Sequence, residues 1–322
     1  MRVLVVGGGS IGARHVRNAR RLGLGQLAVV EPDTKRRQQV IADCHARGFA
    51  TLEEGLGWQP EVAVIATPTS LHVPQAIQAA IAGCHLLVEK PLSDLRETIE
   101  PLAREVEERR LIVLVACNLR FHPGPIALRA LLHERAIGTV IAARLQTGSY
   151  LPRWHPDQDF RQSYSAAEGQ GGAILDCIHE IDLALWFFGP ARVVGAATLP
   201  ATPLGLATDG LAEILLRHQS GVLSSVHLNF VQRDYRRCCQ VIGTHGTIYW
   251  DYGAGRVDLF GKDGRLTRSI EQPADWDCNQ MYVDELAHFV RCVRERRPTV
   301  NPLSGGVAAL RIALSAREQG TA

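Results

Sequence analysis

A short apolar run that opens directly into a glycine-rich turn constrains this chain more than any other feature. Residues 3–12 read Val-Leu-Val-Val-Gly-Gly-Gly-Ser-Ile-Gly. Between a strand and a helix, Gly7 permits the tight turn, Gly9 lets the backbone approach a pyrophosphate, and Gly12 lets the helix pack closely on the strand. The turn, which includes Ser10 and Ile11, predicts a pyrophosphate site at the N-terminus of a helix over 12–22. The alternative is a glycine turn in some other α/β domain.

Glu31 makes the glycine pattern more specific. It closes a second apolar run, 27–30, nineteen positions after Gly12. A carboxylate there accepts hydrogen bonds from the two ribose hydroxyls and repels a 2′-phosphate. This favours NAD as the cofactor. The basic run 35–37 would suit a 2′-phosphate and keeps NADP as the alternative.

Length and composition limit the possible classes of protein. A chain of 322 residues predicts two domains, for which we expect 1–120 and 121–322. The 35 Lys and Arg balance the 33 Asp and Glu, which gives no support to a nucleic-acid or membrane partner. Eight cysteines without a C-x-x-C pair, in a chain lacking an export signal, predict reduced thiols and a cytoplasmic location.

The first 120 residues alternate apolar runs with helical patterns, as βαβ units do. We expect strands over 2–6, 27–31, 61–66, 85–88 and 111–117, with helices near 12–22, 34–47, 72–82 and 94–109. Continuous apolar runs indicate a parallel sheet covered on both faces, that is, an α/β Rossmann domain.

The pattern changes after residue 120. Expected strands are 137–150, 191–199, 211–218, 221–230, 236–243, 246–252 and 255–260, and expected helices are 123–135, 174–187, 279–296 and 303–318. This predicts an α+β domain with a large, mostly antiparallel open sheet. The uncovered face predicts a homo-oligomer, a homodimer or homotetramer.

Three polar segments follow strands of the first domain, where ligands of parallel sheets bind. They contain Thr67, Pro68 and His72, then Glu89 and Lys90, and finally Asn118 and Arg120. Lys90 stands between a carboxylate and a proline that restricts it to extended backbone angles. A solvated surface lysine is the alternative to a catalytic one.

The segment 169–182 is the densest polar stretch within an apolar part of the second domain. On one helix, Asp176 and His179 share a face, which suits proton transfer. A buried structural histidine is the alternative. One such pair without further clustered ligands does not make a metal site, so we expect no metal.

These features occur in a fixed order: the glycine turn, Thr67-Pro68 with His72, Glu89-Lys90-Pro91, Asn118-x-Arg120-Phe121, and Gly171-Gly172 with Asp176 and His179. Together they resemble the glucose–fructose oxidoreductase / inositol dehydrogenase / MocA (Gfo/Idh/MocA) family over essentially the whole chain. The resemblance implies that Lys90 is the catalytic lysine, with Asp176 and His179 as its polar partners at the substrate. It implies that Thr67, Pro68, Glu89 and Asn118 line the nicotinamide side. Many members place the histidine four residues after the aspartate, whereas here the spacing is three.

The segment 150–164 is too polar for core but rich in aromatic residues. Aromatic rings stack on sugar faces, and arginines bind carboxylate or phosphate. The residues expected to bind substrate are Tyr150, Arg153, Trp154, Arg161 and Tyr164, together with Arg120. An ordinary surface loop is the alternative.

These observations predict an NAD-dependent oxidoreductase acting on a secondary alcohol or ketone of a sugar, cyclitol or activated sugar. Lys90 would exchange the hydroxyl proton, helped by His179. Two other classes remain: an NAD-dependent glycosidase with transient oxidation, and a nucleotide-sensing regulator without turnover.

Overall fold

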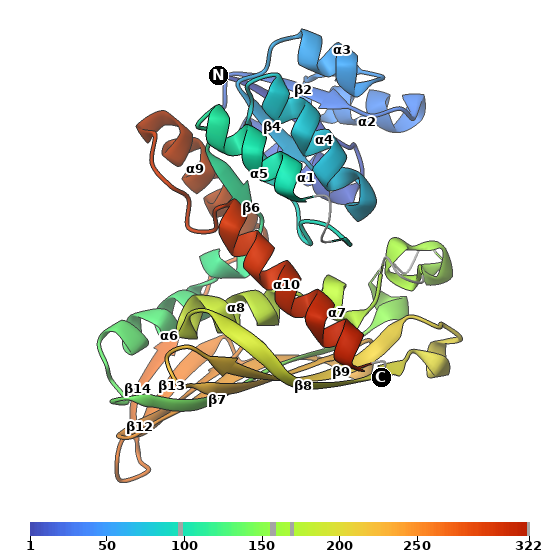
Figure 1. Ribbon diagram of the computed structural model, residues 1–322. Coiled ribbons are helices and arrows are strands. Elements are labelled where there is room, and N and C mark those ends of the chain that lie inside the picture. The colour runs from blue at the N-terminus through green and yellow to red at the C-terminus, as the bar shows by residue number, and fades with distance from the viewer. Residues whose placement is uncertain (96–98, 155–158, 168–170, 321–322) are drawn as a thin grey trace. The chain divides into compact units, whose positions relative to one another are not determined.

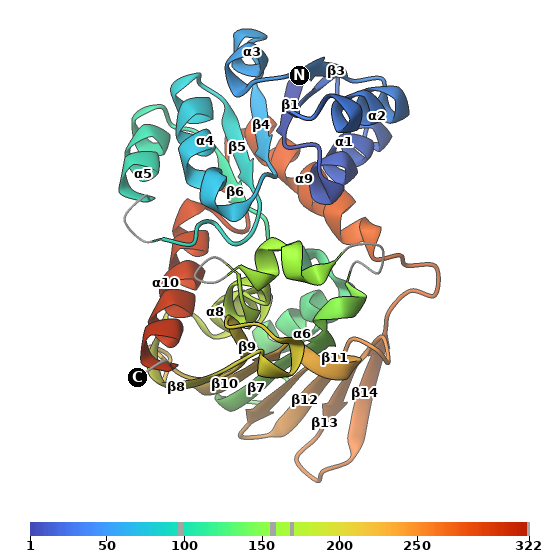
Figure 2. The ribbon, with the colours of Figure 1, turned by 90° about the vertical axis from the view of Figure 1, so that its right-hand side faces the viewer.

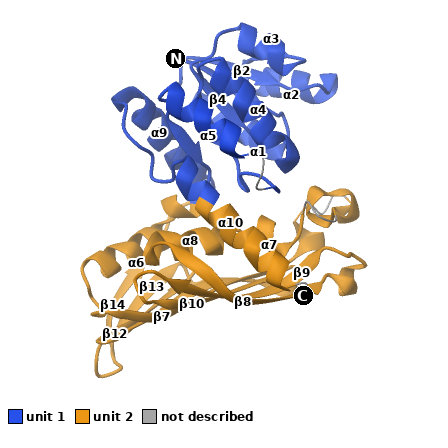
Figure 3. Cartoon of the chain, viewed as in Figure 1, with its two compact units in different colours: residues 1–118, 278–307 blue, residues 119–277, 308–322 orange. Residues whose placement is uncertain are grey.

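The computed structural model describes residues 1–95, 99–154, 159–167 and 171–320 (Figure 1). The chain forms two compact units (Figure 3). Unit 1 contains Met1–Asn118 and Cys278–Val307, and unit 2 contains Leu119–Asp277 and Ala308–Ala322. The structure differs from the expected division because 278–307 leaves the second domain and joins unit 1.

Unit 1 is a parallel six-stranded sheet with strand order β3-β2-β1-β4-β5-β6. Its strands are β1 (Arg2–Val6), β2 (Gln26–Val30), β3 (Arg47–Phe49), β4 (Val62–Ile65), β5 (His85–Val88) and β6 (Val113–Val115). Its helices are α1 (Ser10–Arg21), α2 (Thr34–Cys44), α3 (Leu52–Gly57), α4 (Thr69–Ile81), α5 (Ile99–Glu108) and α9 (Asn279–Glu295). This confirms the Rossmann domain, and the order reverses between β1 and β4, where such sheets bind ligands.

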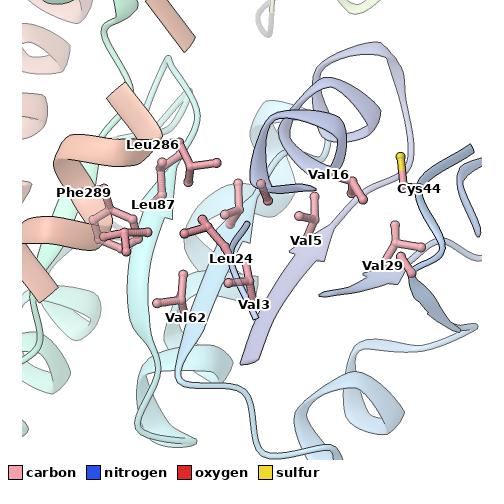
Figure 4. Close-up of a cluster of buried hydrophobic side chains, with 14 of the residues drawn as sticks. Val3, Val5, Val16, Leu24, Val29, Cys44, Val62, Leu87, Leu286 and Phe289 are labelled. Atoms are coloured by element: carbon pink, nitrogen blue, oxygen red, sulfur yellow. The ribbon is translucent and has the colours of Figure 1, made fainter. Parts of the chain in front are cut away.

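The core of unit 1 explains why α9 belongs to it. Leu286 and Phe289 of α9 are fully buried and cluster with Leu87 of β5 and Val3 of β1 (Figure 4). The chain after α9 also pairs with the edge strand β6. The Val115 N–H donates to the Asn301 carbonyl (2.9 Å), and the Asn301 amide donates back to the Val115 carbonyl (2.9 Å).

Unit 2 is built on an eight-stranded sheet with order β14-β13-β12-β11-β7-β10-β9-β8. The strands are β7 (Val140–Tyr150), β8 (Ala191–Pro200), β9 (Asp209–His218), β10 (Leu223–Asn229), β11 (Val231–Gly243), β12 (Gly246–Asp251), β13 (Arg256–Phe260) and β14 (Leu266–Glu271). Only β7 and β10 pair in parallel, so the predicted α+β class is confirmed.

The helices of unit 2 cover one face of its sheet, as Figures 1 and 2 show. They are α6 (Pro123–His133), α7 (Ala173–Asp176), α8 (His179–Phe188) and the larger part of α10 (Leu303–Gly320). On the other face, the side chains of Leu215 (38% exposed) and Tyr249 (43% exposed) reach the surface. None of the described helices combines the length and apolar character needed to cross a membrane.

The structure corrects several expected elements. The helix expected over 34–47 ends at Cys44, and the short elements β3 and α3 follow it. The helix expected over 72–82 begins at Thr69, and β14 is an additional strand. Of the helix expected over 94–109, residues 96–98 lie outside the described residues. The helix expected over 174–187 is two helices, interrupted at Cys177.

Candidate active site

The glycine turn of unit 1 has the geometry that a bound pyrophosphate requires. Gly7 has φ +101°, and a Cβ there would lie 2.6 Å from the Ala66 carbonyl oxygen. A Cβ on Gly12 would overlap the Gly7 carbonyl, whereas one on Gly9 would meet only open space. α1 begins at Ser10 without a side-chain cap, with Ile11 in its first turn. Its first N–H groups are therefore available to an anion, so the residues present fit a dinucleotide.

Glu31 follows β2 and is buried beside this turn. Its carboxylate accepts the Gly8 N–H (2.8 Å) and the Asp33 N–H (3.0 Å). The Arg36 guanidinium lies 3.5 Å from the same carboxylate. Each oxygen keeps a further lone pair, so the side chain is held where it can accept ribose hydroxyls. Arg36 is the group that would serve a 2′-phosphate instead.

The other predicted cofactor residues lie at the carboxyl ends of β4, β5 and β6. The Thr67 hydroxyl donates to Gln75 (2.7 Å), and Pro68 is the N-cap residue of α4. His72 is buried, with Nε2 2.7 Å from the Thr67 carbonyl oxygen and Nδ1 2.9 Å from that of Pro91. Burial lowers the pKa of His72, although both carbonyl contacts act to raise it. Asn118 is buried directly after Cys117.

Lys90 lies on a segment fixed on both sides. The Glu89 carboxylate accepts the Lys90 backbone N–H (3.2 Å) and lies 2.7 Å from Nε2 of His15. The pKa of Glu89 is lowered, because His15 and then Lys90 outweigh the opposing effect of burial. Beyond Lys90, the Pro91 carbonyl meets His72. The structure therefore places Lys90 at the carboxyl edge of the sheet on a rigid backbone, half-buried rather than fully solvated.

In unit 2, the segment 171–182 is held by buried charges. Gly172 has φ +106°, and a Cβ there would overlap the Asp209 carboxylate. Asp209 accepts the Ile174 N–H (2.9 Å) and an Arg317 N–H (3.0 Å), and Arg317 also donates to the Gly171 carbonyl. Burial raises the pKa of Asp209, against the effect of Arg317. The start of α7 is thus fixed by contacts from β9 and α10. Residues 169 and 170 of the predicted segment lie outside the described residues.

Asp176 is the last residue of α7 and is buried. The Tyr164 hydroxyl interacts with its carboxylate, and burial, then the Asp176 charge, raise the pKa of Tyr164 well above its usual value. Gly171 allows this approach, because a Cβ there would overlap backbone atoms of Tyr164 and Ser165. The structure therefore brings together two residues that the sequence placed in separate segments.

His179 begins α8, and Cys177 interrupts the helix before it. Asp176 and His179 therefore do not share one continuous helix face, which corrects the sequence prediction. Within residues 171–184, all of which are described, His179 is the only residue that is not fully buried. His179 is thus half-buried within an otherwise buried stretch, and its role toward a ligand stays a prediction.

Several side chains of the predicted substrate-binding segment, 150–164, contact other residues of unit 2. Arg233 stacks on the Tyr150 ring at 4.0 Å, and Arg153 donates to the Arg233 carbonyl (3.0 Å). Trp154 packs edge-on against Phe230 and donates to Ser149 (3.0 Å), so it supports the segment structurally. Arg161 is exposed beside Asp159. Residues 155–158 lie outside the described residues.

Arg120 is held in a buried ion pair, and its contact with a substrate stays a prediction. Its guanidinium binds both oxygens of Asp182, at 2.8 and 2.7 Å, and both side chains are buried. It also lies over the Trp186 ring. A buried bidentate pair of this kind is costly to separate, so the guanidinium is fixed in position.

Sequence analysis missed His15. The signal was present: it stands three positions after Gly12, on the helix face that packs against the sheet, and is fully buried. It also missed the buried pair Arg237–Glu180 (2.7 Å), whose members are far apart in the chain.

Known families match both units. Residues 1–117 match the oxidoreductase family with an NAD-binding Rossmann fold, and residues 126–249 match the GFO/IDH/MocA C-terminal domain. The chain belongs to the Gfo/Idh/MocA oxidoreductase family. This confirms the predicted family, an NAD-binding oxidoreductase.

Similar proteins in this family are dehydrogenases. Inositol 2-dehydrogenase of Corynebacterium glutamicum is 29% identical over 256 residues, 76% of this chain and 72% of that protein. Levoglucosan dehydrogenase of Pseudarthrobacter phenanthrenivorans is 28% identical over 215 residues, 58% of this chain and 54% of that protein.

Solved structures below 25% identity support the fold. A levoglucosan dehydrogenase complex with NADH and levoglucosan superimposes with TM-score 0.90 at 20% identity, covering 100% of this chain and 97% of the other. UDP-N-acetylglucosamine 3-dehydrogenase of Acidithiobacillus ferrooxidans gives TM-score 0.82 at 22% identity, covering 99% and 97%.

Proposed function

We propose that this protein is an NAD-dependent dehydrogenase that oxidises a secondary alcohol of a sugar or cyclitol, or reduces the corresponding ketone, with Lys90 as acid/base. The observation that carries the proposal is the position of Lys90. It follows β5 at the carboxyl edge of the sheet and is fixed through Glu89 and Pro91. The names of relatives, which include inositol 2-dehydrogenase and D-apiose dehydrogenase, support a sugar-like substrate.

NAD, when bound, supplies a hydride acceptor. The glycine turn and the start of α1 hold its pyrophosphate, and Glu31 accepts its ribose hydroxyls. Thr67, Pro68, His72, Glu89 and Asn118 surround the edge of the sheet at which the nicotinamide would be oriented. In the oxidative direction, Lys90 Nζ takes the proton of the substrate hydroxyl as the carbon gives up its hydride. In the reductive direction, Lys90 returns that proton to the carbonyl oxygen.

We propose that unit 2 binds the substrate through polar groups already held in place. His179 is the second proton-transfer group, and the Tyr164–Asp176 pair accepts or donates hydrogen bonds to sugar hydroxyls. Tyr150, Arg153 and Arg161 contribute stacking and charge. We also propose that the uncovered sheet face of unit 2, with Leu215 and Tyr249, forms a homo-oligomer, which light scattering of the purified chain tests.

The test is NAD reduction by wild type and Lys90→Ala with a panel of inositols, anhydrosugars, pentoses and nucleotide sugars. We expect a substrate-dependent signal in wild type and a loss of about 10²–10⁴-fold in kcat in the variant, with the Kd for NAD unchanged. Equal turnover in the two proteins overturns the role of Lys90. Hydrolysis of a chromogenic glycoside without net NAD reduction would favour the glycosidase reading. NAD binding without turnover across the panel would favour a regulator.

A further inference from the structure

One buried ionisable pair in unit 1 has no part in the proton transfer proposed above. His15 on α1 is 0% exposed, and its Nε2 lies 2.7 Å from Oε1 of Glu89, whose side chain is 12% exposed. Withdrawing a carboxylate and an imidazole from water costs several kcal/mol, and an apolar pair would fill the same space without that cost. A role other than packing is therefore the better explanation of this pair.

The pair is connected to Lys90 through the second oxygen of the same carboxylate. Oε2 of Glu89 accepts the Lys90 backbone N–H at 3.2 Å, while Oε1 is occupied by His15. The carboxylate thus links α1, which carries the glycine turn, to the segment that carries the lysine. Any rotation of the Glu89 side chain would break one of these two contacts.

The His15 ring is itself fixed. The Tyr282 ring of α9 lies edge-on to it, with ring centroids 6.4 Å apart, and the Arg14 guanidinium lies over that tyrosine ring, 4.5 Å from its centroid. Nδ1 of His15 has no hydrogen-bond partner among the residues that the structure describes. The polar contact of the ring within the described chain is therefore directed at Glu89.

We propose that His15 is a positioning residue: it locks the Glu89 carboxylate, which in turn holds Lys90 in its working position. The proposal deepens the function proposed above and rests on it for its catalytic meaning. His72 anchors the far side of the same segment at the Pro91 carbonyl. Lys90 therefore stands between two anchors from two helices, α1 and α4.

Two substitutions separate positioning from packing. His15→Gln keeps an amide N–H donor near the place of Nε2, whereas His15→Leu fills the site without any donor. If His15 only packed, leucine would replace it at least as well as glutamine. If it positions Glu89, only glutamine preserves the state of Lys90.

The lysine content of the chain allows a readout that does not depend on turnover. The sequence contains three lysines, Lys35, Lys90 and Lys262, and the first and last are exposed. Trace labelling with acetic anhydride, followed by mass spectrometry, measures the reactivity of Lys90 relative to Lys262. Lys35 serves as a second internal reference.

We expect His15→Leu to change the Lys90/Lys262 labelling ratio by about threefold or more, a small part of what a charge-assisted hydrogen bond is worth. His15→Gln should retain the wild-type ratio. The Lys35/Lys262 ratio should stay constant in all three proteins, which shows that the change is local. Equal Lys90/Lys262 ratios in wild type and both variants overturn the proposal.

The kinetic arm uses NAD and the alcohol that wild type oxidises. We expect kcat to fall about 10- to 100-fold in His15→Leu, with KM for NAD unchanged and with kcat largely restored in His15→Gln. A loss of equal size in both variants contradicts positioning. If His15→Leu does not fold, Glu89→Gln, which keeps the side-chain shape, takes its place in both assays. If wild type itself lacks dehydrogenase activity, the proposed function fails, while the labelling ratios still decide whether His15 acts on Lys90.

Discussion

The two units hold their functional side chains by different means. In unit 1, histidines and backbone groups do so: Glu31 accepts two backbone N–H groups, and His15 and His72 contact Glu89 and Pro91. In unit 2, three arginine–carboxylate pairs surround α7 and α8, namely Arg120–Asp182, Arg237–Glu180 and Arg317–Asp209.

The difference has a physical consequence. A histidine or a backbone group that contacts one carboxylate can be replaced by another donor, whereas a buried arginine leaves a full charge behind when its partner is lost. We therefore expect single substitutions in unit 2 to act first on stability. Substitutions in unit 1 should act first on cofactor affinity and on the rate of proton transfer.

The largest effect should come from breaking Arg237–Glu180, whose side chains are 14% and 2% exposed. Arg237→Met strands the Glu180 carboxylate in the core, so the free energy of unfolding should fall by about 3–5 kcal/mol. Denaturant titration measures it. Adding Glu180→Leu should recover most of the loss, because no buried charge then remains. As a matched control, Arg265→Met removes an 87% exposed partner of Asp263 and should cost less than about 0.5 kcal/mol. If Arg237→Met lowers the free energy of unfolding no more than Arg265→Met does, the buried pairs of unit 2 do not stabilise it as we expect.

The next effect concerns acid stability and involves His122 of unit 2. Burial, then the charge of Arg237, lowers its pKa to about 4, and its Nδ1 accepts the Gly124 N–H (3.0 Å). The unfolded chain, with the usual histidine value, binds this proton at higher pH than the folded chain does. The resulting stability is present in full above about pH 6.5 and is lost as the pH falls toward 4, by up to about 3 kcal/mol.

His122→Asn, which keeps an acceptor for Gly124, isolates that contribution. Its free energy of unfolding should fall less steeply than that of wild type between pH 6.5 and 4. Parallel curves for the two proteins would show that His122 is not the group responsible.

The smallest effect concerns the choice between NAD and NADP in unit 1. Glu31→Ala removes the carboxylate beside the glycine turn and leaves Arg36 without its acidic neighbour. We expect the NAD/NADP affinity ratio to fall about tenfold, close to 1.4 kcal/mol, with little change in stability. Titration of both cofactors by calorimetry measures the ratio. An unchanged ratio would mean that Glu31 does not select the cofactor.

The sequence predicted those parts of unit 1 that are encoded locally. The glycine turn, the continuous apolar strands and the segment around Lys90 are each contained within a few residues. β3 was missed because it is three residues long and includes Gly48. The break between α7 and α8 was missed because neither Cys177 nor Ile178 is a helix-breaking residue type.

Contacts between residues far apart in the chain could not be predicted from the sequence. No local pattern joins Arg120 to Asp182, so the sequence did not predict that this guanidinium is held in a buried ion pair. His15 and Glu89 are 74 positions apart, and the apolar period of α1 marks His15 as buried without naming its partner. The Tyr164–Asp176 contact likewise depends on the close approach of the Tyr164 backbone to Gly171.

Because α9 belongs to unit 1, part of the core of that unit is synthesised only after most of unit 2. Strands β1–β6 emerge before unit 2, but Leu286 and Phe289 of their core and Asn301 at the edge of β6 are made more than 160 residues after β6. Until then, the nascent nucleotide-binding half exposes an apolar face and an unpaired strand edge, both of which favour aggregation. Unit 1 is therefore completed only after the eight strands of unit 2 have been made, and a fragment limited to the first 120 residues would keep that exposed face permanently.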